Sequence, residues 1–473
     1  MSSLSSALSS LLSGSSSSSS VNLSQILQAA FGASSPGIDV NAAVSAAVTA
    51  ASAPENTWLS QESLVQNQIN ALNSIQNGVS TLDSDLQSLN NLMGPLTSMT
   101  VTSSNSGIVT GSAVSGTASG NHVVVVNNLA TTASWASDTV ASATTPLAAG
   151  SFTITGANGT ATTISTGTGT STLTDVANTI NSDNLGLTAS VVTDANGARL
   201  AIVSNTSGGA ANFSVANGGG LTFSQTTNGV NASYSVDGLS LASASNTVTG
   251  AIPGMTLNLL NASPGTPVSL SVTPNATAAS NAISQFVTDY NSVITAVNNQ
   301  FADSGSGQGV LATDPTVRNL QSELLGALSY TYTPASGTTN VPNLSSMGIT
   351  VNKDGTLSVD NATLTNTLQN HYSDVQNFFQ GTAFNGFAGT MDQQLTNFLS
   401  PSQGAFTVDL QSLNSQYSTL QTNVANFQAN VIAPLQTHLK SEYSQAEILL
   451  QQLPVQMQQI NQELGYYNTT RNG

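Results

Sequence analysis

Residues 410–464 read LQSLNSQYSTLQTNVANFQANVIAPLQTHLKSEYSQAEILLQQLPVQMQQINQEL, and an apolar rhythm of seven residues runs through them. The apolar positions advance by three and four through Leu410, Leu413, Tyr417, Leu420, Val424, Phe427 and Val431, and after a shift of phase through Tyr443, Ala446, Leu450, Leu453, Met457, Ile460 and Leu464. This spacing predicts a coiled-coil helix. At about 1.5 Å per residue the helix would be a rod on the order of 80 Å long, so its apolar stripe needs a partner.

Two further stretches carry the same rhythm and predict helices that pack with the first. One runs through Leu72, Ile75, Val79, Leu82, Leu86, Leu89, Met93 and Leu96 and is broken by Gly94 and Pro95, and the other runs through Ile283, Phe286, Tyr290, Val293, Val297 and Phe301. Between them, residues 101–275 are rich in Thr, Val, Ser and Gly, and apolar residues recur there at every second position, as in strands. The sequence therefore predicts a multidomain α+β fold, in which both chain ends form a coiled-coil and helical stalk around an inserted β-rich head of two small β domains.

The predicted domains follow from these patterns. They are a mobile, mostly disordered N-terminal leg at 1–58, a helical stalk at 59–100 plus 277–431 with a β-hairpin near 348–360, a proximal β head domain at 101–140 plus 230–276, a distal β head domain at 141–229, and a C-terminal helical leg at 432–473. Residues 1–36 include a serine run and cannot bury enough apolar surface to fold alone. Pro434 and Pro454 each remove a backbone donor from the last helix pattern, so we expect bends there.

Composition excludes several classes of function. Only 6 % of the 473 residues are charged, against roughly 25 % in an ordinary soluble domain. Five Lys and Arg cannot neutralise a phosphate backbone, so nucleic acid is not an expected partner. The chain has no Cys, which excludes disulfides and thiolate chemistry. No basic residue precedes the first leucines and no apolar run is long enough for a membrane span, so we expect neither a conventional signal peptide nor a span.

Local signals define smaller elements inside the stalk and the head. Asp39 and Asp314 are predicted helix N-caps, and Pro315 occupies the first position of the second helix. In the distal head domain, residues 173–181 predict a helix that buries Leu173, Val176 and Ile180 on strands to either side, as a small β-α-β unit. The turn at 194–197 predicts a hairpin after it.

Several of these motifs resemble one known family. Gly37-Ile38-Asp39 opens a small apolar helix that precedes a long coiled-coil helix, and the helix at 173–181 ends in Ile-Asn, as in a repeat of flagellin-like heads. Gly348-Ile349-Thr350 and Asp354-Gly355-Thr356-Leu357 are followed by Val359-Asp360 and by a helix that ends in Phe378-Phe379. From Gly37 to Leu464 the order of segments is similar to that of flagellar filament caps, the hook-associated protein 2 family.

The resemblance implies a structural protein without catalysis or cofactor. It would cap the growing bacterial flagellar filament, retain exported flagellin and promote its polymerisation at the tip. Implied partners are further copies of the chain in a ring of roughly five, flagellin, the hook-filament junction protein, a cytoplasmic export chaperone, and host surface glycans or mucin. The implied location is extracellular, at the flagellum tip, after export by the flagellar type III route without a cleaved signal peptide.

The heptad residues are the candidate assembly residues, because they carry more apolar surface than one stalk buries. They are Leu72, Ile75, Val79, Leu82, Leu86, Leu89, Ile283, Phe286, Tyr290, Leu410, Leu413, Tyr417, Leu420, Val424, Phe427, Val431, Leu450, Leu453, Met457, Ile460 and Leu464. In this hypothesis the stalk packs between subunits, the two legs reach into the filament tip, and the head forms an outer plate.

Other functions have weaker support in the sequence. A surface adhesin, with a β head on a coiled-coil stalk, shares the predicted architecture and is the alternative. For an enzyme or a metal protein we find no motif: His122, His371 and His438 are far apart, and the glycine-rich stretches 167–169 and 218–220 are interpreted as turns. Asp83 and Asp85 are expected to be solvated on the polar side of their helix.

Overall fold

The structure, a computed structural model, describes residues 39–469 except 168, 303–306, 336 and 383. The prediction for residues 1–36 lies outside this range. The described chain forms two compact units. Unit 1 contains residues 39–80, 295–322 and 395–469, and unit 2 contains residues 81–294 and 323–394, apart from the gaps just given. Helices of the predicted stalk pass from one unit into the other, so the stalk contributes to both units.

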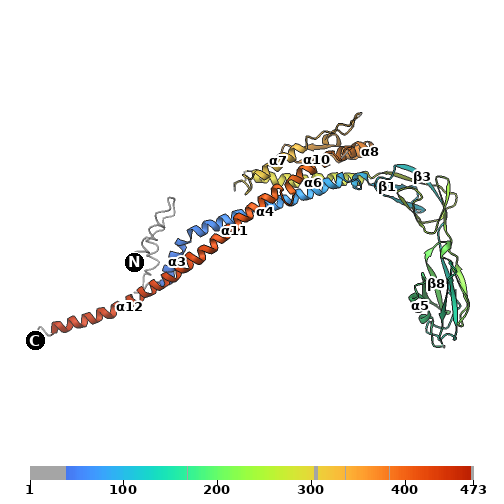
Figure 1. Ribbon diagram of the computed structural model, residues 1–473, viewed down its shortest axis with the longest axis horizontal. Helices are drawn as coiled ribbons and strands as arrows, with labels where there is room; N and C mark the ends of the chain where they lie inside the picture. The colour runs from blue at the N-terminus through green and yellow to red at the C-terminus, as the bar shows by residue number, and fades with distance from the viewer. Residues whose placement is uncertain (1–38, 168, 303–306, 336, 383, 470–473) are drawn as a thin grey trace. The chain divides into compact units, whose positions relative to one another are not determined.

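Unit 1 is helical (Figure 1). It contains α3 (Val40–Ala51), the first part of α4 (Ala53–Asn90), the end of α6 (Ala276–Phe301), the start of α7 (Pro315–Ala327), the end of α10 (Phe387–Leu399), α11 (Ala405–Phe427), the π-helical turn η4 (Gln428–Ile432) and α12 (Ala433–Thr469). Asp39 caps α3 by accepting from the Ala42 amide at 3.0 Å, and Asp314 accepts from the amides of Thr316 and Val317 at the start of α7. Both predicted caps are confirmed.

The heptad residues of α4 and α6 are buried. Leu72, Ile75, Val79, Leu82, Leu86, Leu89, Ile283, Phe286 and Tyr290 are all at most 2 % exposed. Steps of three and four place them on one face of each helix, and complete burial of each such side chain stabilises the fold by about 1.5–3 kcal/mol. The helix α4 ends at Asn90, before Gly94 and Pro95, as the sequence predicted.

The helices of unit 2 pack around an aromatic cluster. Besides parts of α4, α6, α7 and α10, the unit has the 3-10 turns η1 (Pro95–Thr97) and η3 (Leu344–Met347), and the helices α8 (Asn361–Asn370) and α9 (Tyr372–Gln380). Phe387 stacks on Phe378 with ring centroids 5.4 Å apart and meets Phe286 edge-on at 5.6 Å. Tyr330 and Phe379 complete the cluster. The predicted hairpin at 348–360 is confirmed as β16 (Ile349–Val351) and β17 (Leu357–Val359).

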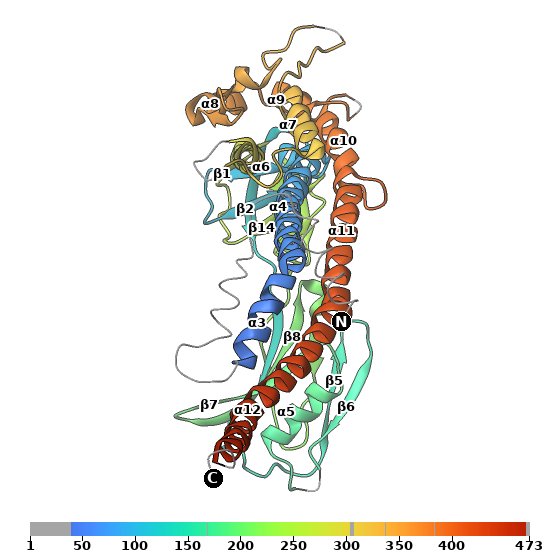
Figure 2. The same cartoon turned by 90° about the vertical axis from the view of Figure 1, so that its left-hand side faces the viewer.

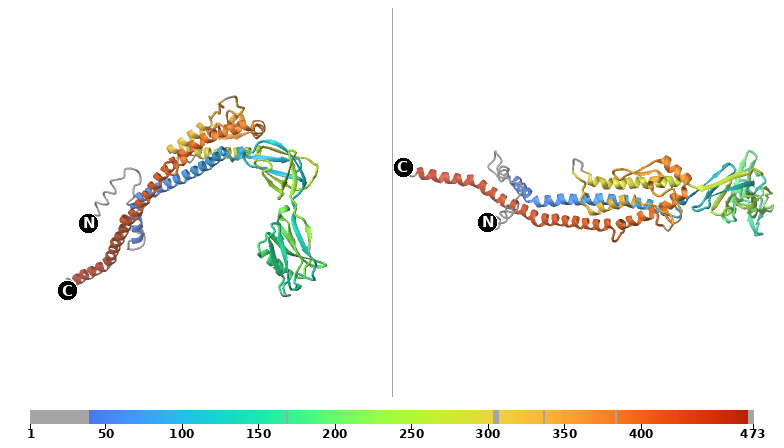
Figure 3. Two further views of the ribbon diagram at one scale, coloured as in Figure 1. Left: turned by 45° about the vertical axis from the view of Figure 1, so that its right-hand side comes forward. Right: turned by 90° about the horizontal axis from the view of Figure 1, so that it is seen from above.

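The head strands of unit 2 form two groups with separate cores (Figure 3). The first group has a five-stranded sheet of order β1-β15-β3-β11-β12 and a three-stranded sheet β13-β14-β2. Its strands are β1 (Met99–Ser103), β2 (Val109–Ala113), β3 (Gly120–Asn128), β11 (Ala232–Val236), β12 (Leu239–Ser243), β13 (Thr247–Thr249), β14 (Met255–Leu259) and β15 (Val268–Pro274).

The second group has a four-stranded sheet β10-β4-β8-β7, a three-stranded sheet β6-β5-β9 and the helix α5 (Leu173–Ser182). Its strands are β4 (Thr132–Ser137), β5 (Ser151–Gly156), β6 (Ala161–Ser165), β7 (Leu187–Asp194), β8 (Gly197–Ser207), β9 (Phe213–Val215) and β10 (Phe223–Thr227). Figure 2 shows α5 beside these strands. It buries Leu173, Val176 and Ile180 as predicted, and the strands before and after it belong to different sheets.

The boundary between the two head groups differs from the predicted one at 140. Strand β4, at 132–137, was assigned to the proximal domain, but it pairs with β8 and β10 of the other group. Ala133 is fully buried in that group's core, and Trp135 packs against it and donates to the Phe213 carbonyl at 2.8 Å. Ala130 still belongs to the first core. The boundary therefore lies between Ala130 and Ala133.

Candidate assembly surface

In unit 1 the helices α4 and α11 run antiparallel, side by side (Figures 1 and 3). Three contacts fix their register. Trp58 meets Phe427 edge-on with ring centroids 5.5 Å apart, Gln428 donates to Glu55, and Gln421 donates to Glu62 at 3.3 Å. Along these contacts the residue numbers rise in α4 as they fall in α11, as in an antiparallel pair. The contacts cover one face of α11 with α4.

The helix α3 continues this arrangement against α12 (Figure 2). If the register of α4 and α11 is extended through α3, its first described residue, Asp39, lies opposite residues near 444. The rest of α12 therefore extends beyond the last residue that α3 can cover.

The apolar face of α11 is only partly covered. Leu413 is buried, but Leu410, Tyr417, Leu420, Val424 and Phe427 are half-buried. These residues contrast with the heptad residues of α4, which are buried completely. A half-buried row of apolar side chains along a helix is a surface that a further helix can cover.

Val431 was predicted on this face, but it is 42 % exposed. The neighbouring Ile432 is 6 % exposed instead. The reason is the π-helical turn at 428–432, which adds a residue to one turn and rotates the following residues around the helix axis. This turn lies directly before Pro434, where a bend was expected, whereas α12 continues without interruption through Pro454.

The far part of α12 exposes an apolar row, which we call the α12 stripe. Its residues are Leu449, Leu453, Met457 and Ile460, which share one face of the helix and are between 48 % and 64 % exposed, while the exposed Ile448 and Val455 lie on another face. Of the predicted residues, Leu453, Met457 and Ile460 belong to it, Leu450 is half-buried, and the Leu464 side chain lies outside the described side chains. Together the half-buried face of α11, Val431 and the α12 stripe form the candidate assembly surface.

The surface carries little charge. From residue 405 to residue 460 the charged side chains are Asp409, Lys440, Glu442 and Glu447. A chain with a net charge of −17 thus keeps most of its acidic residues away from this surface. Two copies can approach here with little electrostatic repulsion.

Asp83 and Asp85 are not solvated as the sequence suggested. Both are half-buried, and each faces a second carboxyl group, Asp392 for Asp83 and Asp289 for Asp85. Burial, assisted by Asp392, raises the pKa of Asp83 to about 7, and burial with Asp289 raises the pKa of Asp85 to about 6. The partners are distant in sequence, and heptad periodicity gives no sign of them.

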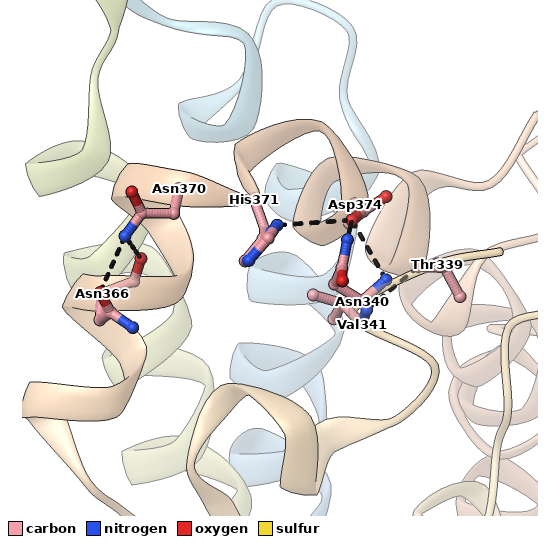
Figure 4. Close-up of polar contacts among 7 residues, drawn as sticks. All are labelled: Thr339, Asn340, Val341, Asn366, Asn370, His371 and Asp374. Carbon is pink, nitrogen blue, oxygen red and sulfur yellow. Dashed lines mark hydrogen bonds and ion pairs between the residues drawn. The ribbon is translucent and has the colours of Figure 1, made fainter.

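The histidines take part in local structural contacts. His122 Nδ1 lies 2.8 Å from Asp237 Oδ2. At the N-terminus of α9, His371 Nδ1 lies 4.0 Å from Asp374, which accepts from Asn340 Nδ2 at 2.8 Å and so ties the loop before η3 to the helix (Figure 4). Among the residues that the structure describes, no three His, Cys, Asp or Glu side chains gather as a metal site, and no helix is long and apolar enough to cross a membrane.

Comparison with protein families gives three matches. The model of the flagellar hook-associated protein 2 N-terminus matches residues 36–133, and that of its C-terminus matches residues 229–454. The flagellin hook IN motif matches residues 151–206, which form β5 to β8 with α5. This last match covers the repeat that the sequence pattern identified.

Individual relatives agree with these families. The chain is 24 % identical over 446 residues to the B-type flagellar hook-associated protein 2 of Pseudomonas aeruginosa PAO1, covering 87 % of this chain and 92 % of the relative. It is 33 % identical over 175 residues to the A-type protein of Pseudomonas aeruginosa, covering 36 % of this chain and only 35 % of the relative. Among solved structures, the D1-D2-D3 domains of the flagellar cap protein FliD from Escherichia coli share the fold with a TM-score of 0.57 and 23 % identity, covering 73 % of this chain and 99 % of that chain.

Proposed function

The chain belongs to the flagellar hook-associated protein 2 family, the flagellar filament caps, and on that premise we propose that it works as a homo-oligomeric cap whose subunits associate through the candidate assembly surface. The comparisons support a cap and give no support to the alternative of a surface adhesin. The proposed role is structural: retaining flagellin at the filament tip and promoting its polymerisation there.

The single observation that carries the proposal is the contrast in burial within unit 1. Leu72 of α4 is completely buried, whereas Leu420 of α11 is half-buried and Leu453 of α12 is 48 % exposed. All three belong to apolar heptad patterns that predict helix packing. Since the described part of the subunit does not complete the cover of α11 and α12, we propose that a second copy does so.

The α12 stripe extends this role toward the filament. We propose that the C-terminal part of α12 helps to hold the cap on the filament tip through apolar contact with a neighbouring cap subunit. Its side chains have large exposed apolar areas and lie on a helix with few charges, so burying them is favourable. The same proposal includes export by the flagellar type III route, a cytoplasmic export chaperone and contact with the hook-filament junction protein.

The test is complementation of a flagellated host that lacks its own cap protein. The variant Leu453→Ser/Met457→Ser/Ile460→Ser removes apolar surface from α12, and Val123→Ser/Val192→Ser/Leu239→Ser removes exposed apolar side chains from the head as a matched control. We expect the α12 variant to release unpolymerised flagellin into the medium and to leave filaments short, while the control behaves as the wild type. Normal filaments with the α12 variant, at normal secreted levels of the protein, would contradict the role of this helix.

A further inference from the structure

Three pairs of carboxyl groups lie between helices, and each contains a buried oxygen for which the described residues provide no hydrogen-bond donor. In the first pair, Asp83 of α4 faces Asp392 of α10. The side-chain amide of Gln87 donates to both carboxyls, at 2.8 Å to Asp83 Oδ2 and 3.2 Å to Asp392 Oδ1. Asp83 Oδ1 is buried and accepts from no donor in the described residues. One amide thus bridges two acids, and the remaining oxygen of Asp83 is left without a donor.

The second pair joins α4 to α6. Asp85 faces Asp289, and Gln285 donates to Asp289 Oδ2 at 2.8 Å. Asp85 Oδ2 is buried and has no donor within the described chain. This pair and the first lie in unit 2.

The third pair lies in unit 1, between α11 and the start of α7. Asp409 faces Asp314, which accepts from the amides of Thr316 and Val317 as the N-cap of α7. Asp409 Oδ2 is buried and has no donor among the described residues.

Cationic side chains do not explain these pairs. The chain has only five Lys and Arg. Arg318 is the cationic residue nearest in sequence to Asp314. Its guanidinium donates a hydrogen bond to the Ala312 carbonyl and lies over the Phe301 ring. The polar side chains beside these three acids are the facing carboxyls, the Gln87 amide at Asp83 and the Thr316 hydroxyl at Asp409.

Two ionised carboxylates in contact repel each other and leave a buried oxygen unsatisfied, whereas a carboxylic acid can donate to the facing carboxylate. We propose that each of the three pairs shares a proton when the subunit is folded, and that this proton strengthens the contacts of α4 with α10 and α6 and of α11 with α7. The helical packing is then stronger in mild acid than at alkaline pH. This property concerns the fold of the subunit and does not depend on the proposed function.

The pKa shifts agree with this geometry. Burial, together with the facing Asp314, raises the pKa of Asp409 to about 6, in line with the raised pKa values of Asp83 and Asp85. A raised folded pKa means that the folded state binds the proton more tightly than the unfolded state, whose Asp pKa is about 3.9. The added stability is fully present below that unfolded pKa and is lost as pH rises through about 6 to 7.

Four other carboxyls have pKa shifts of the opposite sign. Thr172, Thr356 and Thr363 donate to Asp175, Asp354 and Asp360 and lower their pKa values, and His122 does the same for Asp237. For Asp175, Asp354 and Asp360 the lowered folded pKa gives stability that is present above the ordinary Asp pKa and is lost as the pH falls through the folded pKa, which lies below the window of interest.

The experiment compares thermal unfolding of the full chain at about pH 5 and pH 8, followed by circular dichroism at 222 nm in EDTA at constant ionic strength. The variant Asp83→Asn/Asp85→Asn/Asp409→Asn places a neutral donor in each pair. The control Asp183→Asn/Glu323→Gln/Glu442→Gln removes the same charge from exposed positions. The three single Asn variants are measured as well, so that a triple variant that fails to fold does not end the test.

We expect the wild type and the control to melt several degrees higher at pH 5 than at pH 8. The triple variant should melt at pH 8 near the wild-type value at pH 5, and each single variant should lose part of the pH dependence. A wild-type midpoint that is constant or falls toward pH 5 would overturn the proposal. So would Asn variants that keep the wild-type difference.

Discussion

Replacing buried and half-buried leucines of unit 1 should separate stability from association. Leu72 on α4 is completely buried and Leu420 on α11 is half-buried. Leu72→Ala leaves a cavity in a closed contact and should lower the free energy of unfolding by about 2–5 kcal/mol. Leu420 is already partly in water in the isolated subunit, so Leu420→Ala should cost only about 1 kcal/mol, roughly half the transfer free energy of a fully buried leucine.

Association of subunits should be weakened by changes on α11 that have little effect on the stability of the single subunit. If a second copy covers α11, the double variant Leu420→Ala/Val424→Ala removes apolar surface from each contact between subunits. A loss of about 1–2 kcal/mol of binding free energy per contact raises the dissociation constant by roughly 5- to 30-fold. The isolated subunit should nevertheless keep its helical circular dichroism.

Urea unfolding of dilute subunits and mass photometry over a concentration series measure the two quantities independently. The result that refutes the reasoning is a Leu420→Ala protein that unfolds as easily as Leu72→Ala, or a Leu420→Ala/Val424→Ala protein that forms oligomers as readily as the wild type. The first outcome would place α11 inside a closed subunit core, and the second would place the association surface elsewhere.

Three further outcomes follow from the structure. A fragment of residues 98–276 should be soluble and β-rich by circular dichroism, because the two head cores contain no residue of the helices α4 or α6, and an aggregated fragment would show a shared core. Deleting residues 444–473 should leave the melting temperature of unit 1 unchanged, because α3 covers only the start of α12. The same deletion should abolish capping, and normal filaments with the shortened protein would contradict that expectation. Gly348→Ala should lower the free energy of unfolding by about 1–3 kcal/mol, because Gly348 has a φ of +81° and a Cβ there would lie 2.8 Å from the Cβ of Thr363. Gly250 has the same φ of +81° but open space around it, so Gly250→Ala should cost less. Urea titration of the two variants measures the difference.

Much of the helical fold is predictable from the sequence because burial and heptad spacing coincide in α4 and α6. The predicted residues from Leu72 to Leu89 and from Ile283 to Tyr290 are buried as their periodicity indicates. Caps and hairpins were equally predictable, since Asp39 and the turn at 194–197 are decided by local chemistry.

What the sequence could not predict depends on contacts between distant segments. The apolar heptad pattern changes phase near residue 431, and the sequence is compatible with several positions for this change. The structure shows that a π-helical turn there buries Ile432 in place of Val431. The alternation of side chains in β4 is compatible with a strand of either head group, so its pairing with β8 decides the group to which it belongs. The facing carboxyls of Asp83 and Asp392 are brought together by tertiary packing alone.

The central claim, that a second copy covers α11 and α12, is tested most directly by thiol labelling during assembly. Because the chain has no Cys, a single cysteine reports on one position, and Val431→Cys, Leu453→Cys and the head control Val192→Cys start from similar exposures of 42 %, 48 % and 49 %. Maleimide labelling is timed on dilute subunits and on assembled rings. We predict that labelling of Val431→Cys and Leu453→Cys slows at least tenfold on assembly while that of Val192→Cys does not change. Equal labelling rates at all three positions in assembled rings would contradict the claim.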